Sequence, residues 1–254
     1  MVRDADVPPI ESPWPRDEPG PAPVSEVQLW LADLDRPPVP LDRLAPLLDP
    51  EESARAARFR FDVHRHRFTV GRGLLRILLG RMTGYAPERL EFRYGVKGKP
   101  FLTGPAAEVS GLQFTLSNSA NGVLVAVARG GEVGADLEAL RPLDDAAELV
   151  ERFFAPSERS AFRRLPPEQR LAGFFSGWTR KEAYVKARGD GLSLPTTEFE
   201  MTLEPASPAR LERFDREPEE VGRWSFEAFE PARGFLGAVA VEGGKREIVS
   251  RLWR

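Results

Sequence analysis

The chain has 254 residues, of which 41% are hydrophobic and 30% charged, a composition typical of a soluble globular protein. It has no cysteine and only two histidines, His64 and His66, which excludes disulfides, thiolate chemistry, cysteine-based zinc sites and multi-histidine metal sites. The net charge of −3 gives no overall attraction to nucleic acid or to anionic membranes, and no apolar run reaches the length of about 18 residues that a membrane span needs.

Two further expectations come from these counts. Any metal ion must be held by oxygen ligands, which favours Mg²⁺, Mn²⁺ or Ca²⁺. No signal-peptide core follows Met1, so we expect a cytoplasmic protein with neither nucleic acid nor membrane as a partner.

The chain begins with a proline-rich stretch. Residues 1–25 contain seven prolines and few apolar side chains, which predicts a disordered tail. A first strand follows at residues 27–31. Asp49, which precedes Pro50 and two acidic residues, predicts a helix start. A second helix is expected over residues 63–79, before Gly84.

The rest of the chain alternates strands and helices. We expect two strands around a glycine-containing turn at residues 95–99, and a hairpin whose strands meet at Gly130 and Gly131. The predicted strands are 92–94, 100–102, 114–117, 123–128, 132–138, 199–203, 224–229, 236–241 and 247–252, and the predicted helices are 144–153, 157–165 and 167–188.

Residues 123–131 resemble residues 235–244 when one insertion is allowed. Such a match also arises by chance, because many hairpins share this pattern. A true duplication predicts an α+β fold of two similar α/β halves, residues 26–138 and 139–254, with a cleft between them. Clefts of this kind are preferred ligand sites.

Two acidic residues are spaced as neighbours on one face of a strand. Asp136 and Glu138 are two positions apart, so their side chains point to the same side. The simplest explanation is a solvated sheet edge. Paired carboxylates also attract a cation, and Gly134 beside them leaves room for a ligand.

A second polar stripe lies on the predicted helix 167–188. Trp178, Glu182 and Lys186 are spaced by four, which places them on one face. A surface ion pair beside a core tryptophan explains the pattern without a ligand. Together with Asp136 and Glu138, and with positive charge from Lys181 and Arg188 nearby, the stripe instead suggests a pyrophosphate substrate held with Mg²⁺.

The residues also resemble a known family. The segment 178–192, WTRKEAYVKARGDGL, is similar to the W-x-x-K-E-A-x-x-K signature of 4′-phosphopantetheinyl transferases. Four further segments resemble segments of the family and follow one another along the chain in the order found there: GKP at 98–100, FTLSNS at 114–119, GADLE at 134–138 and RFFAPSE at 152–158. The likeness covers residues 49–195, and the length with an apparent duplication resembles the Sfp-type, pseudo-twofold branch.

The resemblance implies transfer of the 4′-phosphopantetheine arm of coenzyme A to a serine of an apo acyl or peptidyl carrier protein, with release of 3′,5′-ADP. It implies that Asp136, Glu138 and Glu182 hold Mg²⁺, with Mn²⁺ as an alternative. Glu182 would also be the general base, and Lys186 would neutralise the leaving diphosphate. Lys181 would be either structural or in contact with phosphate.

The coenzyme A contacts are also implied by the resemblance. They are the adenine-pocket segment Gly98, Lys99 and Pro100, the phosphate-binding Arg67 and Arg72, the weaker candidate Arg65, and Ser117 and Asn118 near the 3′-phosphate. Asn118 stands where many members have histidine, which puts more of the phosphate recognition on the arginines. Ala135 replaces a β-branched residue with little expected consequence.

A basic surface for an acidic carrier protein is suggested by Arg159, Arg163 and Arg164, although a solvated helix face explains them equally. A duplicated chain forms its own cleft, so a monomer is expected. Two alternatives stay open: a catalytically silent homologue that binds coenzyme A or a carrier protein, and another Mg²⁺-dependent phosphoesterase or nuclease.

Overall fold

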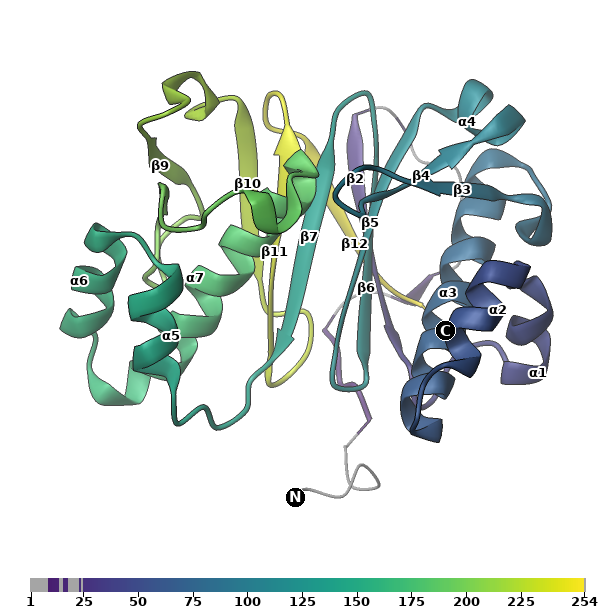
Figure 1. Cartoon of the computed structure of the whole chain (residues 1–254), viewed down its shortest axis with the longest axis horizontal. Coiled ribbons are helices and arrows are strands. Elements are labelled where there is room, and N and C mark those ends of the chain that lie inside the picture. Colours follow the sequence, from purple (N-terminus) through teal and green to yellow (C-terminus); the bar gives the residue numbers. More distant parts are fainter. Residues whose placement is uncertain (1–8, 14–15, 18–22, 24, 254) are drawn as a thin grey trace.

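The computed structural model describes residues 9–13, 16, 17, 23 and 25–253. Two β-sheets pack face to face at its centre, and a long helix covers the outer face of each, α3 on one side and α7 on the other (Figure 1). Both helices have 22 residues, α3 (Asp62–Thr83) and α7 (Pro167–Arg188), and both end at a glycine in the left-handed conformation, Gly84 and Gly189. The layers therefore repeat, as the apparent duplication predicts.

The larger sheet belongs mainly to the N-terminal half. Its strand order is β1-β12-β2-β6-β5. One face, with Trp30, Val123 and Phe114, packs against α3, while the opposite face packs against the second sheet. The strand bounds are β1 (Arg16–Asp17), β12 (Glu247–Trp253), β2 (Glu26–Asp33), β6 (Gly122–Arg129) and β5 (Leu112–Ser119).

The smaller sheet has the order β10-β11-β7 and is antiparallel. Its inner face contributes Val133, Leu137 and Val239 to the core between the sheets, and its outer face packs Ala238 and Ala240 against α7. The bounds are β10 (Trp224–Phe229), β11 (Phe235–Glu242) and β7 (Val133–Ala139).

The predicted hairpin of residues 123–128 and 132–138 is wrong. β6 pairs with β2 and β5, whereas β7 pairs with β11 in the other sheet. The chain crosses between sheets at Gly130 and Gly131, both with positive φ. Alternating apolar residues fit either arrangement, because both put one face of each strand into a core.

The second copy of the repeat makes the reverse crossing. β11 lies in the smaller sheet, and β12 returns to the larger sheet, where it pairs in parallel with β2 (Figure 1). A boundary at residue 138 therefore does not separate two sheets, because each half lends its last strand to the other.

Smaller elements complete the fold. Asp49 caps α2, as the sequence predicts, and the structure adds a reciprocal capping box with Glu52. The helices are α1 (Leu41–Leu44), α2 (Pro50–Ala57), α4 (Gly104–Ser110), α5 (Ala146–Phe153) and α6 (Pro156–Arg164), the 3₁₀ turns are η2 (Ala45–Leu47), η3 (Pro87–Arg89), η4 (Gly191–Ser193) and η5 (Pro218–Glu220), and the strands are β3 (Glu91–Tyr94), β4 (Pro100–Thr103), β8 (Phe199–Met201) and β9 (Leu211–Phe214). Of these helices and strands, α1, α4 and β9 have no counterpart in the sequence prediction, and neither have the 3₁₀ turns.

Part of the proline-rich segment is ordered, which corrects the expectation of a tail without structure. Ile10 packs against the core between the sheets, and its backbone N–H donates to Asp33. Ser12 donates to the Pro231 carbonyl, and β1 pairs in parallel with β12. Residues 1–8, 14, 15, 18–22 and 24 of this segment lie outside the described residues. Among the helices that are described, none is long and apolar enough to cross a membrane.

Candidate active site

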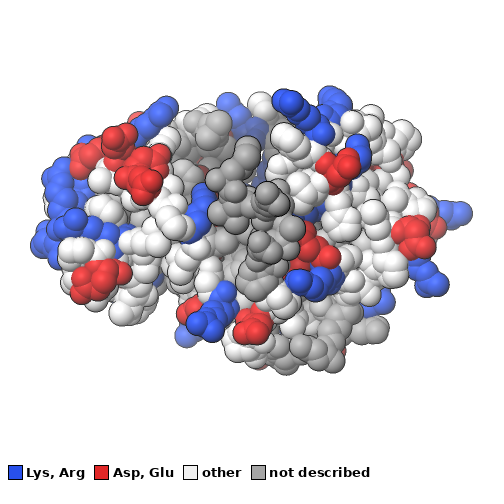
Figure 2. All heavy atoms as spheres, turned by 90° about the horizontal axis from the view of Figure 1, so that it is seen from below, with Lys and Arg blue, Asp and Glu red and all other residues white. Residues whose placement is uncertain are grey.

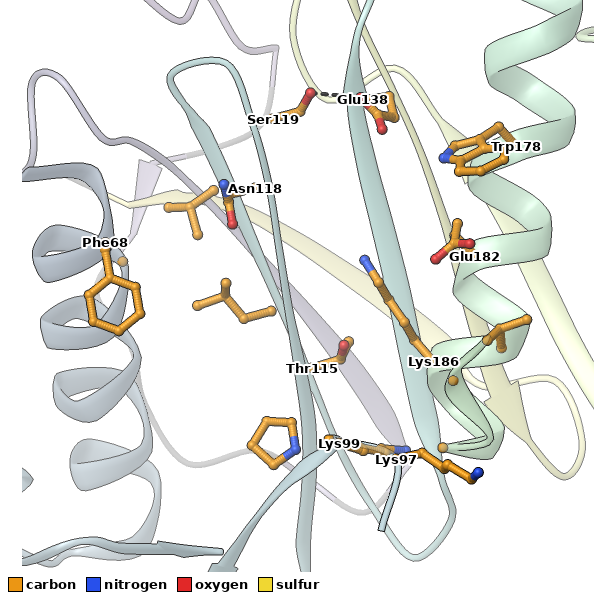
Figure 3. A pocket seen from close by; sticks show the side chains of 18 of the residues that line it. Phe68, Lys97, Lys99, Thr115, Asn118, Ser119, Glu138, Trp178, Glu182 and Lys186 are labelled. Carbon is orange, nitrogen blue, oxygen red and sulfur yellow. Dashed lines mark hydrogen bonds between the residues drawn. The ribbon is translucent and has the colours of Figure 1, made fainter. Parts of the chain in front are cut away.

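A large cavity lies between α3 and α7, with β5 and β7 as its floor (Figure 3). Its volume is about 1190 Å³. Phe68 on α3 faces Trp178, Glu182 and Lys186 on α7 across this space. The two halves of the chain thus supply opposite walls of one site.

The cavity is strongly basic although the whole chain is not. Two of the lining side chains are acidic, Glu138 and Glu182. Eight are basic: Arg55, Arg67, Arg72, Lys97, Lys99, Arg141, Arg152 and Lys186. A concave site with this excess attracts polyanions, because low-dielectric walls focus the field of the charges.

The two acidic residues of β7 share one side of the strand, as its periodicity predicts, and the fold turns this side towards α7. Asp136 is buried, and its Oδ1 accepts hydrogen bonds from Lys186 Nζ at 2.6 Å and from Ser117 Oγ at 2.8 Å. Glu138 Oε2 accepts from Ser119 Oγ at 2.7 Å and from Arg141 at 3.1 Å.

Gly134 serves α7 rather than a ligand. A Cβ atom at this position would lie 2.1 Å from the Ala187 nitrogen and 2.2 Å from the Ala183 oxygen. The absence of a side chain lets the backbone of α7 approach β7 directly. The prediction that Gly134 leaves room for a ligand is therefore wrong, because the space is filled by the helix that carries Glu182 and Lys186.

The stripe on α7 lines the cavity as its spacing predicts. Trp178 stacks on Phe174 and meets Phe153 edge to face, which fixes the indole at the cavity wall. Burial raises the pKa of Glu182, and the negative charge of Asp136 raises it further, against the opposing effect of Lys186. Among the described residues, no hydrogen bond is made by the Glu182 carboxylate.

The chemistry of these carboxylates fits a divalent cation. Asp136 Oδ2 is buried with no hydrogen-bond partner in the described part of the chain. A cation would stabilise this oxygen, because a buried polar atom without a partner is unfavourable. It would also stabilise the half-buried carboxylate of Glu182, which the neighbouring negative charges repel. Across the residues that the structure describes, however, no three acidic or histidine side chains are gathered closely enough to hold a metal ion. The ammonium group of Lys186 is the cation that contacts Asp136.

The two predicted phosphate-binding arginines line the cavity but already have partners. Arg67 donates to Asp35 through two bonds of 2.8 Å. Arg72 is buried, donates to Glu52 and lies over the ring of Phe92. The weaker candidate, Arg65, pairs with Asp62 and is not part of the cavity lining.

The segment at residues 98–100 forms part of the cavity wall. Gly98 has a φ of 88°, which the turn between β3 and β4 requires. Lys99 directs its ammonium group away from solvent, to Glu132 and to the carbonyls of Val133 and Ala187. Lys99 therefore links this segment to β7 and α7 by hydrogen bonds. Pro100, the next residue, lines the cavity.

The two neighbours at residues 117 and 118 point in different directions. Asn118 is exposed and lines the cavity. Ser117 is buried, is not part of the cavity lining, and contacts Asp136 and Lys186. The structure thus places the Ser117 hydroxyl on a carboxylate rather than in the space where a 3′-phosphate was expected.

Lys181 and Arg188, the two further cations predicted beside the stripe on α7, do not line the cavity. Lys181 is 1% exposed, forms an ion pair with Glu158 at 2.8 Å, and donates to the carbonyls of Thr196 and Phe199. These contacts join α7 to neighbouring segments. Arg188 points to the far side of α7, where it pairs with Asp190, Glu217 and Glu220.

Sequence reasoning missed several lining residues. Arg55, Lys97 and Arg152 make no ion pair with any described residue, although Arg55 lies over Phe68 and Arg152 over Phe153. Arg152 is the first residue of the RFFAPSE segment, which resembles a family segment, so the sequence carries a signal for it. Arg55 and Lys97 are ordinary surface cations by pattern, and only the fold places them at the cavity.

Comparisons with known proteins identify the family of this chain. Residues 132–240 match the 4′-phosphopantetheinyl transferase superfamily, and residues 39–130 match the 4′-phosphopantetheinyl transferase N-terminal family. The 4′-phosphopantetheinyl transferase HetI of Nostoc is 45% identical over 218 residues, which cover 86% of this chain and 88% of the relative. The 4′-phosphopantetheinyl transferase psf-1 of Bacillus pumilus is 32% identical, over 70% of this chain and 73% of the relative.

A holo-(acyl-carrier-protein) synthase of Bacillus anthracis, solved in complex with CoA (3′,5′-ADP), aligns with 22% identity over 44% of this chain and 96% of its own. The TM-score is 0.34, so this alignment adds nothing to the assignment. The sequence relatives carry the assignment on their own, because the match to HetI extends over nearly all of both chains. The chain therefore belongs to the 4′-phosphopantetheinyl transferase superfamily.

Proposed function

We propose that this protein transfers the 4′-phosphopantetheine arm of coenzyme A to a serine of an apo acyl or peptidyl carrier protein. The observation that carries the proposal is the basic cavity between α3 and α7, in which Glu182 faces a carboxylate pair and Lys186. A cavity of about 1190 Å³ with eight basic lining residues suits a ligand of the size and phosphate content of coenzyme A.

In the proposed reaction, the serine hydroxyl oxygen of the carrier attacks the phosphorus atom that bears the pantetheine arm. A new P–O bond forms as the bond to the bridging oxygen of the pyrophosphate breaks, and 3′,5′-ADP leaves with that oxygen and its electron pair. Glu182 accepts the serine proton, directly or through water. The raised pKa of Glu182 suits this role, because a base of higher pKa holds the proton more strongly.

Asp136, Glu138 and Glu182 would hold Mg²⁺, or Mn²⁺ in its place, once binding of the ion draws together carboxylates that do not converge in the described part of the structure. The ion would supply neutralisation of the charge on the pyrophosphate. The orphaned Oδ2 of Asp136 is the group in this structure that favours such a ligand set.

Lys186 would exchange partners when the substrate binds. In the structure its ammonium group lies on Asp136, and its side chain is 30% exposed to the cavity. A diphosphate beside it competes for the same cation, because phosphate oxygens form strong charge-assisted bonds. Lys186 on the leaving group would then stabilise the negative charge that develops there.

The proposed protein partner is an apo carrier domain. Figure 2 shows basic side chains at the end of the molecule that carries α5 and α6, with acidic side chains among them. Arg159 and Arg163 both pair with Glu151, which reduces their availability, whereas Arg164 makes no ion pair within the described residues. We propose a monomer, because one chain supplies both walls of the cavity.

The test is incubation with coenzyme A, Mg²⁺ and several apo carrier proteins, followed by intact mass measurement of the carrier. We expect a mass gain of one phosphopantetheine group and the appearance of 3′,5′-ADP. Glu182→Gln is expected to lower turnover by about 10²-fold or more while coenzyme A still binds, and the exposed Glu227→Gln is the matched control. No mass gain on any carrier would refute the proposal, and near-normal turnover of Glu182→Gln would remove this residue from the role of base.

A further inference from the structure

Two serines on β5 stand opposite the two acidic residues of β7. Ser117 and Ser119 are two apart on one strand, as Asp136 and Glu138 are on the other. Each serine hydroxyl donates to one carboxylate, at 2.8 Å for Ser117 to Asp136 and 2.7 Å for Ser119 to Glu138. The second of these bonds is drawn in Figure 3. The spacing of the acids is therefore matched by the spacing of their donors.

The same two hydroxyls also accept hydrogen bonds from the backbone of β7. The N–H of Leu137 donates to Ser117 Oγ at 3.3 Å, and that of Ala139 donates to Ser119 Oγ at 3.1 Å. Alternate residues of a strand direct their N–H groups to opposite edges, and β7 is the last strand of its sheet. Each serine therefore accepts a hydrogen bond from a backbone N–H of the edge strand β7. The same serine donates to the acidic side chain one position earlier on β7.

This arrangement fixes the direction of each hydroxyl proton. A serine hydroxyl has one proton, and an oxygen that accepts from a backbone N–H is free to donate that proton to the carboxylate. At Ser117, Lys186 Nζ is a further donor to the oxygen, at 3.0 Å. Asp136 and Glu138 are therefore each held on one oxygen, and the second oxygen of Asp136 has no hydrogen-bond partner among the described residues.

The serines come from the larger sheet and the acids from the smaller one. The hydrogen bonds between the serines and the acids therefore join the two sheets at the floor of the cavity. We infer that Ser117 and Ser119 are positioning residues, which hold Asp136 and Glu138 through one oxygen each and so direct their other oxygens to a divalent cation when it binds. The inference rests on the proposed metal role of these acids and goes beyond it by assigning the hydroxyls.

Ser119 gives the cleaner test, because Ser117 is buried and its replacement can weaken folding. We expect Ser119→Ala to raise the dissociation constant for Mn²⁺, measured by electron paramagnetic resonance with and without coenzyme A, by about 10-fold or more. The Mg²⁺ concentration for half-maximal transfer should rise in parallel, with the KM for coenzyme A little changed. Ser119→Thr keeps the hydroxyl and should restore both values.

Two controls separate this role from a general loss of structure. Ser225→Ala removes a strand serine whose hydroxyl donates only to the carbonyl of Gly243, and it should leave Mn²⁺ binding unchanged. In a Glu138→Gln background, Ser119→Ala should have no further effect, since its action passes through Glu138.

A dissociation constant for Mn²⁺ within twofold of wild type in Ser119→Ala would overturn the inference, and so would a full additional effect in the Glu138→Gln background. The absence of Mn²⁺ binding by the wild-type protein would overturn it as well. The Mn²⁺ titration needs no turnover, so its outcome is independent of whether a carrier protein gains mass. The inference about the serines and the proposed transfer reaction can therefore fail separately.

Discussion

The buried pair of Lys181 and Glu158 joins two of the family segments, WTRKEA and RFFAPSE. The side chains are 1% and 3% exposed, and the ammonium group also donates to the carbonyls of Thr196 and Phe199. Burial lowers the pKa of Lys181 and raises the pKa of Glu158. We predict that Lys181→Met lowers stability and leaves the chemistry of folded molecules intact.

The magnitude follows from the burial of both partners. Removal of one member of a buried ion pair costs about 3–5 kcal/mol, because the other charge is left without compensation. For a domain of this size, 1 kcal/mol corresponds to about 2–4 °C in Tm, so Lys181→Met should lower Tm by roughly 6–20 °C. Arg163→Met, at the exposed pair with Glu151, should cost less than about 1 kcal/mol.

The assay is urea denaturation followed by tryptophan fluorescence, with turnover measured below the unfolding transition. The double variant Lys181→Met/Glu158→Gln should recover part of the loss, because no buried charge then lacks a partner. Turnover per folded molecule should stay within about threefold of wild type. A loss of stability below about 1 kcal/mol together with a large fall in turnover would refute the structural role and place Lys181 at the substrate.

Three further outcomes are expected. Without divalent cations, Glu182→Gln should raise the free energy of unfolding by about 1 kcal/mol at pH 7. Burial raises the pKa of Glu182 in the folded state above 4.5, so the gain should vanish below pH 4.5 and grow as the pH rises above it. Urea titrations across that pH range measure it. Gly134→Ala should cost about 3 kcal/mol by displacing α7, whereas Gly244→Ala, with open space around the added methyl group, should be neutral in the same measurement. Ile10→Ala should lower stability by about 1 kcal/mol, and an unchanged Tm would show that this contact contributes nothing to folding.

The helices and strands were largely predictable because their signals are local. Gly84 and Gly189 end the two long helices at the positions where a left-handed residue is needed. The pairing of the strands was not predictable, because it depends on distant partners. β7 meets β11, about a hundred residues later in the chain, and the same alternation of apolar residues suits that sheet and a local hairpin.

The site shows the same division. Helix geometry alone places Trp178, Glu182 and Lys186 on one face, and strand geometry places Asp136 beside Glu138. The partners of the basic residues are set by the tertiary fold instead. Lys99 finds its acceptor on Ala187, which is 88 residues away, so its structural role is invisible in the segment where it lies.

The charge of the cavity could not be predicted from the amino-acid composition, because the composition gives only the net charge of the whole chain. Five of the eight basic lining residues are compensated by an acidic side chain, which helps to keep the net charge of the chain near neutrality. Arg55, Lys97 and Arg152 have no such partner within the described residues and all border the same space. The electric field that a bound ligand meets is set mainly by the few uncompensated charges around it, and much less by the net charge of the chain. A chain with a net charge of −3 can therefore attract a polyphosphate ligand.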